Sequence, residues 1–151
     1  MTCHLNKTQN EDRSCVPRIP VKWRAGRYND FMSTSPTAGW PHPDELDALV
    51  AAPESHSLLF ENEAVRVLET RVAAGGHVPL HTHRRPGMFT VLSTSDFVQK
   101  GPNGEVILDT RVSGNPLGGR TMWSEPLPPH SLDNVGDSEI HVIHVELKTG
   151  P

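Results

Sequence analysis

The fold of this chain is decided by residues 75–83, which read GGHVPLHTH. The paired glycines predict a turn, and the residues after them predict a strand. Side chains two residues apart in a strand point to the same face, so we expect His81 and His83 to project side by side. Two neutral imidazoles at this spacing can hold one divalent metal ion. The same pair can also hydrogen-bond or face solvent, and this stretch alone leaves those alternatives open.

A second stretch, residues 126–134, reads PLPPHSLDN. It brings a third histidine, His130, after a rigid proline turn. Asn134 opens another turn before a final predicted strand. Three histidines in two separate stretches favour a metal site more than the His-x-His pair does by itself.

Together the two stretches resemble the two motifs of the cupin superfamily, over about residues 55–149. The first cupin motif has a glycine, five residues and then His-x-His, as Gly75, His81 and His83 do here. The second has a proline-rich approach to a histidine, three residues and then an asparagine, as in the stretch from Pro128 to Asn134. The resemblance implies an all-β fold with one cupin-type antiparallel β-barrel, the RmlC-like double-stranded β-helix or jelly roll. It also implies a homodimer, since many such barrels pair through an edge strand or an exchanged terminal segment.

The resemblance assigns metal ligation to His81, His83 and His130, with Asn134 shaping a turn. A glutamate ligand is expected three or four residues after His83, where Gly87 and Met88 stand. The usual Pro-x-Gly of the second motif is also missing. Three neutral histidines leave the charge of the metal uncompensated and leave positions open, which favours a small anionic, chelating substrate. Thiol dioxygenases of the superfamily are similar, with three histidines, no carboxylate ligand and iron. We expect a divalent metal ion (Fe, Mn, Ni or Zn); loss of the metal together with the glutamate is the alternative.

Arginines and a further histidine are candidate substrate contacts. Arg84 and Arg85 follow the histidine pair and can supply a cation for a substrate carboxylate, or can be two solvated loop residues. On the final predicted strand, His141 shares a face with Ile143, Val145 and Leu147. We expect it to line the barrel as a substrate contact or as a hydrogen-bonded rim residue.

Other residues have weaker claims on the site. His77 shares strand parity with His81 and is a substitute ligand or a surface residue. Glu125 lies nearest to the second motif among the acids, as a general base or a surface carboxylate. Phe89 and Trp123 are expected in the core, with stacking on a substrate as the alternative.

Composition narrows the class of protein. The chain has 151 residues, enough for one domain with a core, and its 14 prolines favour a turn-rich β protein over a helical bundle. The whole chain has a formal net charge of −4. Residues 1–31 carry six Lys/Arg against three Asp/Glu, a net charge of +3, so residues 32–151 carry a net charge of −7. An acidic body excludes a nucleic-acid footprint, and no apolar run is long enough for a membrane helix. Cys3 and Cys15 form no disulfide framework, and no secretion signal is seen, so we expect a cytoplasmic protein.

The chain is expected to divide into a flexible extension, residues 1–42, and a cupin domain, residues 43–151. Met32 offers a second translation start, which makes residues 1–31 a hypothetical gene-model artefact; a partner-binding basic arm is the other reading. A short helix is predicted from Pro43, with Leu46, Leu49 and Val50 on one face and Pro53 after its end. Eight to ten short strands should follow, at 56–60, 64–74, 79–83, 88–92, 97–100, 105–112, 121–123 and 139–147 among others, with a hairpin turn at Asn103-Gly104.

The function we expect is a small metal-binding enzyme, an oxidoreductase of the dioxygenase type if the metal is iron, with lyase and isomerase chemistry left open. The alternative is a non-catalytic ligand-binding or sensor barrel, with or without metal. The catalytic residues beyond the metal ligands stay unassigned, since a fold does not dictate a reaction.

Overall fold

The computed structural model describes residues 39–117 and 120–148. The predictions made for residues 1–38, including Cys3, Cys15 and the second start at Met32, lie outside the described residues. The described part holds nine strands and three short helices. In chain order they are η1 (Asp44–Leu46), α1 (Ala48–Ala51), β1 (His56–Glu61), β2 (Val65–Val72), β3 (His77–His83), β4 (Gly87–Ser93), β5 (Phe97–Lys100), β6 (Val106–Asp109), α2 (Thr110–Ser113), β7 (Thr121–Ser124), β8 (Leu127–Asn134) and β9 (Ile140–Leu147).

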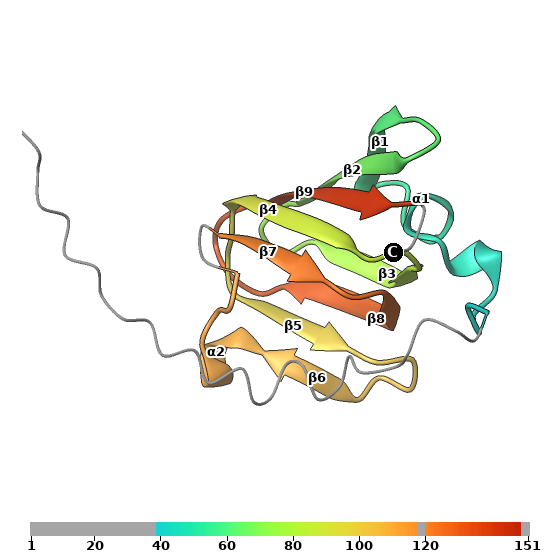
Figure 1. The fold of residues 1–151 in the computed structure, drawn as a ribbon. Coiled ribbons are helices and arrows are strands. Elements are labelled where there is room, and N and C mark those ends of the chain that lie inside the picture. Colours follow the sequence, from blue (N-terminus) through green and yellow to red (C-terminus); the bar gives the residue numbers. More distant parts are fainter. Residues whose placement is uncertain (1–38, 118–119, 149–151) are drawn as a thin grey trace, which may run out of the picture. The chain divides into compact units, whose positions relative to one another are not determined.

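The strands form two antiparallel sheets (Figure 1). One sheet has the order β1-β2-β9-β4-β7, and the other has the order β3-β8-β5-β6. Strands distant in sequence are neighbours in both sheets, as β2 is of β9 and β3 is of β8. This is the cupin-type β-sandwich, or jelly roll, that the two motifs predict, and the all-β fold class is confirmed.

One predicted strand and one predicted turn differ from the observed elements. Residues 105–112 do not form one strand, because the Asp109 side chain accepts a hydrogen bond from the Arg111 amide and caps α2. The proline turn predicted before His130 is instead the first half of β8. Prolines lack an amide donor, and the register between β3 and β8 shifts between the pairs His81–His130 and His83–Leu127, opposite the two prolines.

The helix predicted from Pro43 is one 3₁₀ turn followed by one α-helical turn. Its buried residues are Ala48 and Ala52 and not the predicted leucine face; Val50 is 62% exposed. Asp47 caps α1 by accepting a hydrogen bond from the Leu49 amide, and its backbone forms a β-bridge with Thr82 of β3. The segment therefore covers the outer side of β3, where the Thr82 hydroxyl donates to the Leu46 carbonyl oxygen.

Inward-facing residues change from apolar to polar along the strands. On β9, Ile140 and Val142 lie in the apolar core, and His144 and Glu146 are buried further along. On β3, a core valine is likewise followed by His81 and His83. The apolar cluster consists of Ala52, Val72, Val78, Val91, Phe97, Ile140 and Val142. Buried histidines and charges therefore collect at one end of the sandwich.

Asn134 shapes a turn at the opposite, apolar end. Its side-chain amide donates to the carbonyl oxygens of Val72, Ala73 and Ser138 at 2.9, 3.0 and 2.8 Å. These bonds join the end of β2 to the loop before β9. The structural part of the prediction for Asn134 is confirmed.

Candidate metal centre

Four buried histidines come together from three strands. His81 and His83 extend from the same face of β3, and His130 of β8 stands directly opposite His81 in the register. The ring centroids of His81 and His130 are 4.3 Å apart, and those of His81 and His83 are 5.2 Å apart. The fourth histidine is His56, the first residue of β1.

His56, which no sequence motif singled out, lies close to the pair on β3. Its ring centroid is 4.7 Å from that of His81 and 5.3 Å from that of His83. One ligand atom of each of these three residues lies within 4.8 Å of the others. His130 is outside this set, and its ring centroid is 6.0 Å from that of His83. The four residues therefore consist of a close group of three, His56, His81 and His83, and of the His130 imidazole beside it.

Each of the four imidazoles is held through its Nδ1 atom. Nδ1 of His81 donates to the Pro79 carbonyl oxygen and Nδ1 of His130 to that of Pro128, both at 2.8 Å. Nδ1 of His56 donates to the Ala52 carbonyl oxygen at 3.2 Å, and Nδ1 of His83 donates to Glu146 Oε1 at 3.1 Å. Carbonyl and carboxylate oxygens only accept, so the proton sits on Nδ1 in all four rings.

The Nε2 atoms of these rings are therefore lone-pair donors. Among the described residues, none of the hydrogen bonds of the four histidines uses Nε2. A ligating histidine characteristically donates its other ring proton to a carbonyl or carboxylate group, which fixes its tautomer and orientation. The donor set thus fits a divalent metal ion.

Burial keeps the site uncharged. Desolvation lowers the pKa of His56 to about 4, and it lowers the pKa of His81 and His83 well below the usual value for histidine. The pKa of His130 is lowered for the same reason. All four rings are therefore neutral at pH 7, which is the form that binds a metal.

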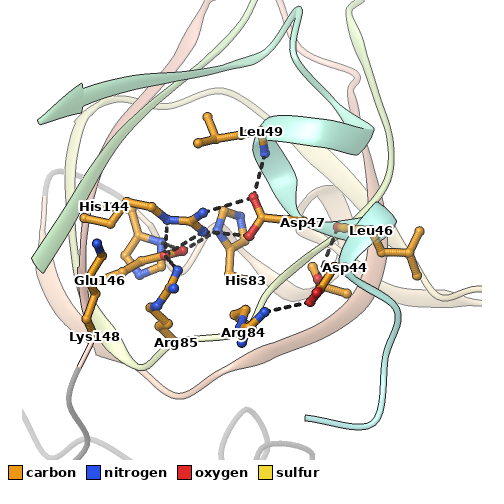
Figure 2. A network of polar contacts seen from close by, with 12 residues as sticks. Asp44, Leu46, Asp47, Leu49, His83, Arg84, Arg85, His144, Glu146 and Lys148 are labelled. Carbon is orange, nitrogen blue, oxygen red and sulfur yellow. Dashed lines mark hydrogen bonds and ion pairs between the residues drawn. The ribbon is translucent and has the colours of Figure 1, made fainter. Parts of the chain in front are cut away.

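A buried ion-pair network stands behind His83 (Figure 2). Glu146, with no exposed surface, accepts a hydrogen bond from Arg66 Nε at 2.7 Å and from His83. Arg66 also donates to both carboxylate oxygens of Asp47, at 3.1 and 2.9 Å. The half-buried Arg85 lies 3.7 Å from Glu146. Two arginines and two carboxylates thus cancel in charge, and Glu146 is engaged in orienting His83.

His144 fills the place where the cupin pattern expects a glutamate. A Cβ atom at Gly87 would meet the Val145 carbonyl oxygen and would stand 2.9 Å from His144 Nε2, so no larger side chain fits. His144 has no exposed surface, and both of its ring nitrogens lack a hydrogen-bond partner. Desolvation lowers its pKa to about 4. Its Nδ1 atom lies 3.6 Å from Glu146 Oε1, and one ligand atom each of His83, His144 and Glu146 lie within 4.8 Å of one another.

The structure places the remaining sequence candidates as follows. Arg84 is exposed and pairs with Asp44 at 2.7 Å, whereas Arg85 leans toward Glu146. His77 is exposed and pairs with Asp133. Glu125 is exposed and accepts a hydrogen bond from Trp123, whose side chain is 55% exposed and does not lie in the core. Phe89 is half-buried and packs on His144, with ring centroids 4.0 Å apart.

His141 was predicted on the wrong face of β9. The residues buried on that strand are Ile140, Val142, His144 and Glu146, so the even-numbered positions point inward. His141 points outward, where its Nε2 atom bonds Glu69 at 2.8 Å. Position 144 supplies the inward histidine.

Sequence reasoning missed His56, His144, Glu146 and Arg66. Strict alternation on β9 offered a signal for His144 and Glu146 together, as one polar pair on one face. No spacing rule pointed to His56, which precedes the His-x-His pair by a whole hairpin. Arg66 carried no signal beyond its place in an alternating strand.

Comparisons with known proteins concern the fold. No protein-family model and no curated protein matches the chain. Solved structures that share the cupin-type fold include a cupin domain from Bordetella pertussis Tohama I, 21% identical, covering 62% of this chain and 92% of that one, with a TM-score of 0.48. Two others are the polyketide cyclase RemF from Streptomyces resistomycificus (17% identity, 67% and 70% coverage, TM-score 0.42) and a predicted oxalate decarboxylase from Thermotoga maritima (18% identity, 61% and 78% coverage, TM-score 0.39).

The described residues contain no helix with the length and apolar character needed to cross a membrane.

Proposed function

We propose that this chain is a small metal-binding cupin that holds a divalent ion through His81, His83 and His130 and binds a small anionic molecule on it. The observation that carries the proposal is the shared use of Nδ1. Each ring gives its proton to a fixed acceptor and keeps Nε2 free, which is unexpected for histidines that merely fill a core.

The charge of the site supports an anionic ligand. The imidazoles are neutral, and Arg66 and Asp47 belong to a network whose charges cancel with those of Arg85 and Glu146. A bound divalent ion would therefore keep its full charge in a water-poor interior, where electrostatic attraction is strong. Of the two candidate arginines, Arg84 is tied to Asp44 at the surface and Arg85 lies beside Glu146, so Arg85 is the one that we propose as a substrate contact.

A bound metal would supply Lewis acidity and, if it is iron, activation of O₂ toward dioxygenation. The chain's own contribution is to fix the imidazoles, to keep them neutral and to exclude bulk water. Lyase or isomerase chemistry uses the same Lewis acidity. A non-catalytic ligand-binding or sensor function is the second candidate. It is favoured by the hydrogen bonds from Arg66 and His83 to Glu146, which leave this buried carboxylate unavailable as a general base.

Metal content of the freshly purified protein tests the proposal. The double variant His81→Ala/His130→Ala should lose the metal that the wild type carries in near-stoichiometric amount. The matched control is His77→Ala/His141→Ala, which also removes two histidines but from the surface. Equal metal content in both double variants, or a wild type that stays empty on anaerobic loading with Fe, Mn, Ni and Zn, would refute the metal site.

Enzyme and sensor are then separated with the loaded protein. Oxygen uptake on adding thiols or catechols to the iron form would support the dioxygenase. Calorimetric binding of a small carboxylate without any turnover would support the sensor.

We also propose a homodimer through the outer face of the five-stranded sheet. One row of apolar residues crosses all five strands, because the registers pair Phe60 with Val67, Val67 with Val145, Val145 with Met88, and Met88 with Trp123. Phe60, Met88 and Trp123 are about half exposed. A continuous exposed apolar patch is typical of an interaction surface.

A second copy of this chain suits that row because the charges beside it are already paired. Glu69 bonds His141 and Arg71, and Arg71 also bonds Glu139. A twofold contact would therefore bring no uncompensated charge into the interface. Light scattering should show a dimer for the wild type and for Val106→Lys, an exposed valine on β6, but a monomer for Met88→Lys. A monomeric wild type would rule out the dimer.

A cytoplasmic location remains part of the proposal, on the ground that the sequence has two cysteines and no disulfide framework. Rapid alkylation of both thiols in freshly lysed cells is the expected result.

A further inference from the structure

The strand that begins the barrel has one buried residue, and that residue is a histidine. His56 is buried, while residues 57–61 of β1 are exposed. The loop before it is tightly closed, since the Ala52 carbonyl oxygen accepts the backbone amides of Ser55 and His56, at 3.1 and 3.0 Å, as well as the His56 ring proton. Backbone and side chain together fix the ring beside the pair on β3, with its centroid 4.7 Å from that of His81 and 5.3 Å from that of His83.

The cupin carboxylate has no way into this site from β4. Gly87 occupies its place, and the space next to Gly87 is filled by the β9 backbone and the His144 ring. The other buried carboxylate, Glu146, is bonded to Arg66 and to the Nδ1 side of His83. The ligand atoms of His83, His144 and Glu146 form a second close group, but that group does not include His81. Only His56 has a nitrogen grouped with those of both His81 and His83 among the described residues.

We propose that His56 supplies the fourth metal ligand in place of the missing carboxylate, which completes a set of four neutral imidazoles with His81, His83 and His130. This inference rests on the proposed metal site. Four nitrogen donors suit Fe, Co, Ni, Cu and Zn, and they disfavour Mg, Ca and Mn, which prefer oxygen. The set also leaves the ion with its full double charge, so the open positions select an anion.

The ligand role has a structural consequence for β1. This strand lies at the edge of its sheet, where β2 is its one partner among the strands that the structure describes. A metal bound to His56 and to the histidines of β3 would tie the edge strand to the facing sheet. Metal binding should therefore slow hydrogen exchange of the β1 amides, whereas removal of the metal should leave β1 as a weakly protected edge.

The variant His56→Asn separates the ligand role from a structural one. The asparagine amide nitrogen takes the place of Nδ1 and keeps the bond to Ala52, so only Nε2 is lost. The control is His77→Asn, the same change at an exposed histidine of β3. Zinc and cobalt titrations of metal-stripped protein give the affinities, and the visible absorption of the cobalt form reports the number of ligands. Circular dichroism and thermal melting of the metal-free proteins confirm that the variants fold.

For His56→Asn we expect at least about 100-fold weaker binding, beyond the 10–100-fold loss usual for residues behind a ligand. We also expect an altered cobalt spectrum and no metal-induced protection of β1. His77→Asn should match the wild type in all three measurements. If His56→Asn binds cobalt with wild-type affinity and spectrum, and His81→Asn does not, His56 is no ligand and the three-histidine site stands. If the wild type binds neither ion, the proposed function itself fails.

Discussion

The most specific prediction concerns Glu146, the carboxylate that accepts a hydrogen bond from Nδ1 of His83. Glu146 is fully buried and accepts hydrogen bonds from Arg66 at 2.7 Å and His83 at 3.1 Å. In Glu146→Gln the side chain keeps its shape but loses its charge. Arg66 then keeps only Asp47 as a charged partner, and the glutamine must turn one NH₂ group toward a donor.

The cost follows from these contacts. Removing one partner of a buried ion pair costs about 3–5 kcal/mol when the other charge is left alone. Asp47 still compensates Arg66, so we expect about 2–3 kcal/mol for the metal-free protein. For a domain of this size each kcal/mol lowers Tm by roughly 3–6 °C, so the melting temperature should fall by about 10 °C. Metal affinity should fall by about 10–100-fold, since His83 loses the acceptor that fixes its tautomer.

Thermal melting of the metal-free protein and zinc titration check both numbers. The matched control is Glu69→Gln on the neighbouring β2, which also removes a carboxylate bonded to a histidine and an arginine. That network lies at the surface, where solvent screens the pair, so stability and metal binding should barely change. A Glu146→Gln variant that melts and binds zinc like the wild type would refute the argument that Glu146 orients His83.

Three further predictions concern a buried glycine, a turn asparagine and the stability of the protein at acid pH. Gly87→Ala should fail to fold or lose several kcal/mol in urea unfolding, because its Cβ would collide with the β9 backbone and His144, whereas Gly39→Ala, with nothing within 4 Å, should not. Asn134→Ala removes three hydrogen bonds and should lower the free energy of unfolding by about 3 kcal/mol, at roughly 1 kcal/mol for each bond. The control Asn103→Ala, at an exposed position, should leave it unchanged. The metal-free protein should lose stability as pH falls, because the pKa values of His56 and His144 drop from 6.5 to about 4 on folding. The unfolded chain takes up these protons first, so the loss of folding stability starts near pH 6.5 and continues to about pH 4. Its size is up to about 1.4 kcal/mol per pH unit for each histidine. An unchanged midpoint of urea unfolding between pH 7 and pH 5 would contradict this prediction.

The sequence predicted the architecture well because both histidine motifs are recognisable and the strands between them alternate. Most strand positions followed from alternation, and Gly104, with φ of +80°, does form the hairpin turn between β5 and β6. The failures were local. Thr110 does not continue the strand, because its hydroxyl hydrogen-bonds Asp96 and the Phe97 backbone. This is a tertiary contact that sequence periodicity does not reveal.

The centre was predictable only in part, for a similar reason. His81, His83 and His130 carry a recognisable spacing, and the structure brings them into one buried cluster. His56 reaches that cluster only because β1 pairs with β2 and α1 folds back beside β3, which is information about topology. Glu146 and Arg66 are 80 positions apart and meet because Arg66 stands opposite Glu146 in the β2–β9 register.

His141 was assigned to the wrong face because β9 is apolar on both faces, and this property of β9 also concerns the assembly of the protein. Its outward residues Ile143, Val145 and Leu147 are at least as apolar as its inward ones, so hydrophobicity pointed to the wrong side. A central strand whose outer side met only water would carry polar residues there, since antiparallel sheets with one solvated face alternate. Apolar residues on both faces are typical of a strand that is covered on both sides. Val145 is also the centre of the row from Phe60 to Trp123, so the feature that misled the assignment of His141 is itself an argument that a second copy covers this sheet.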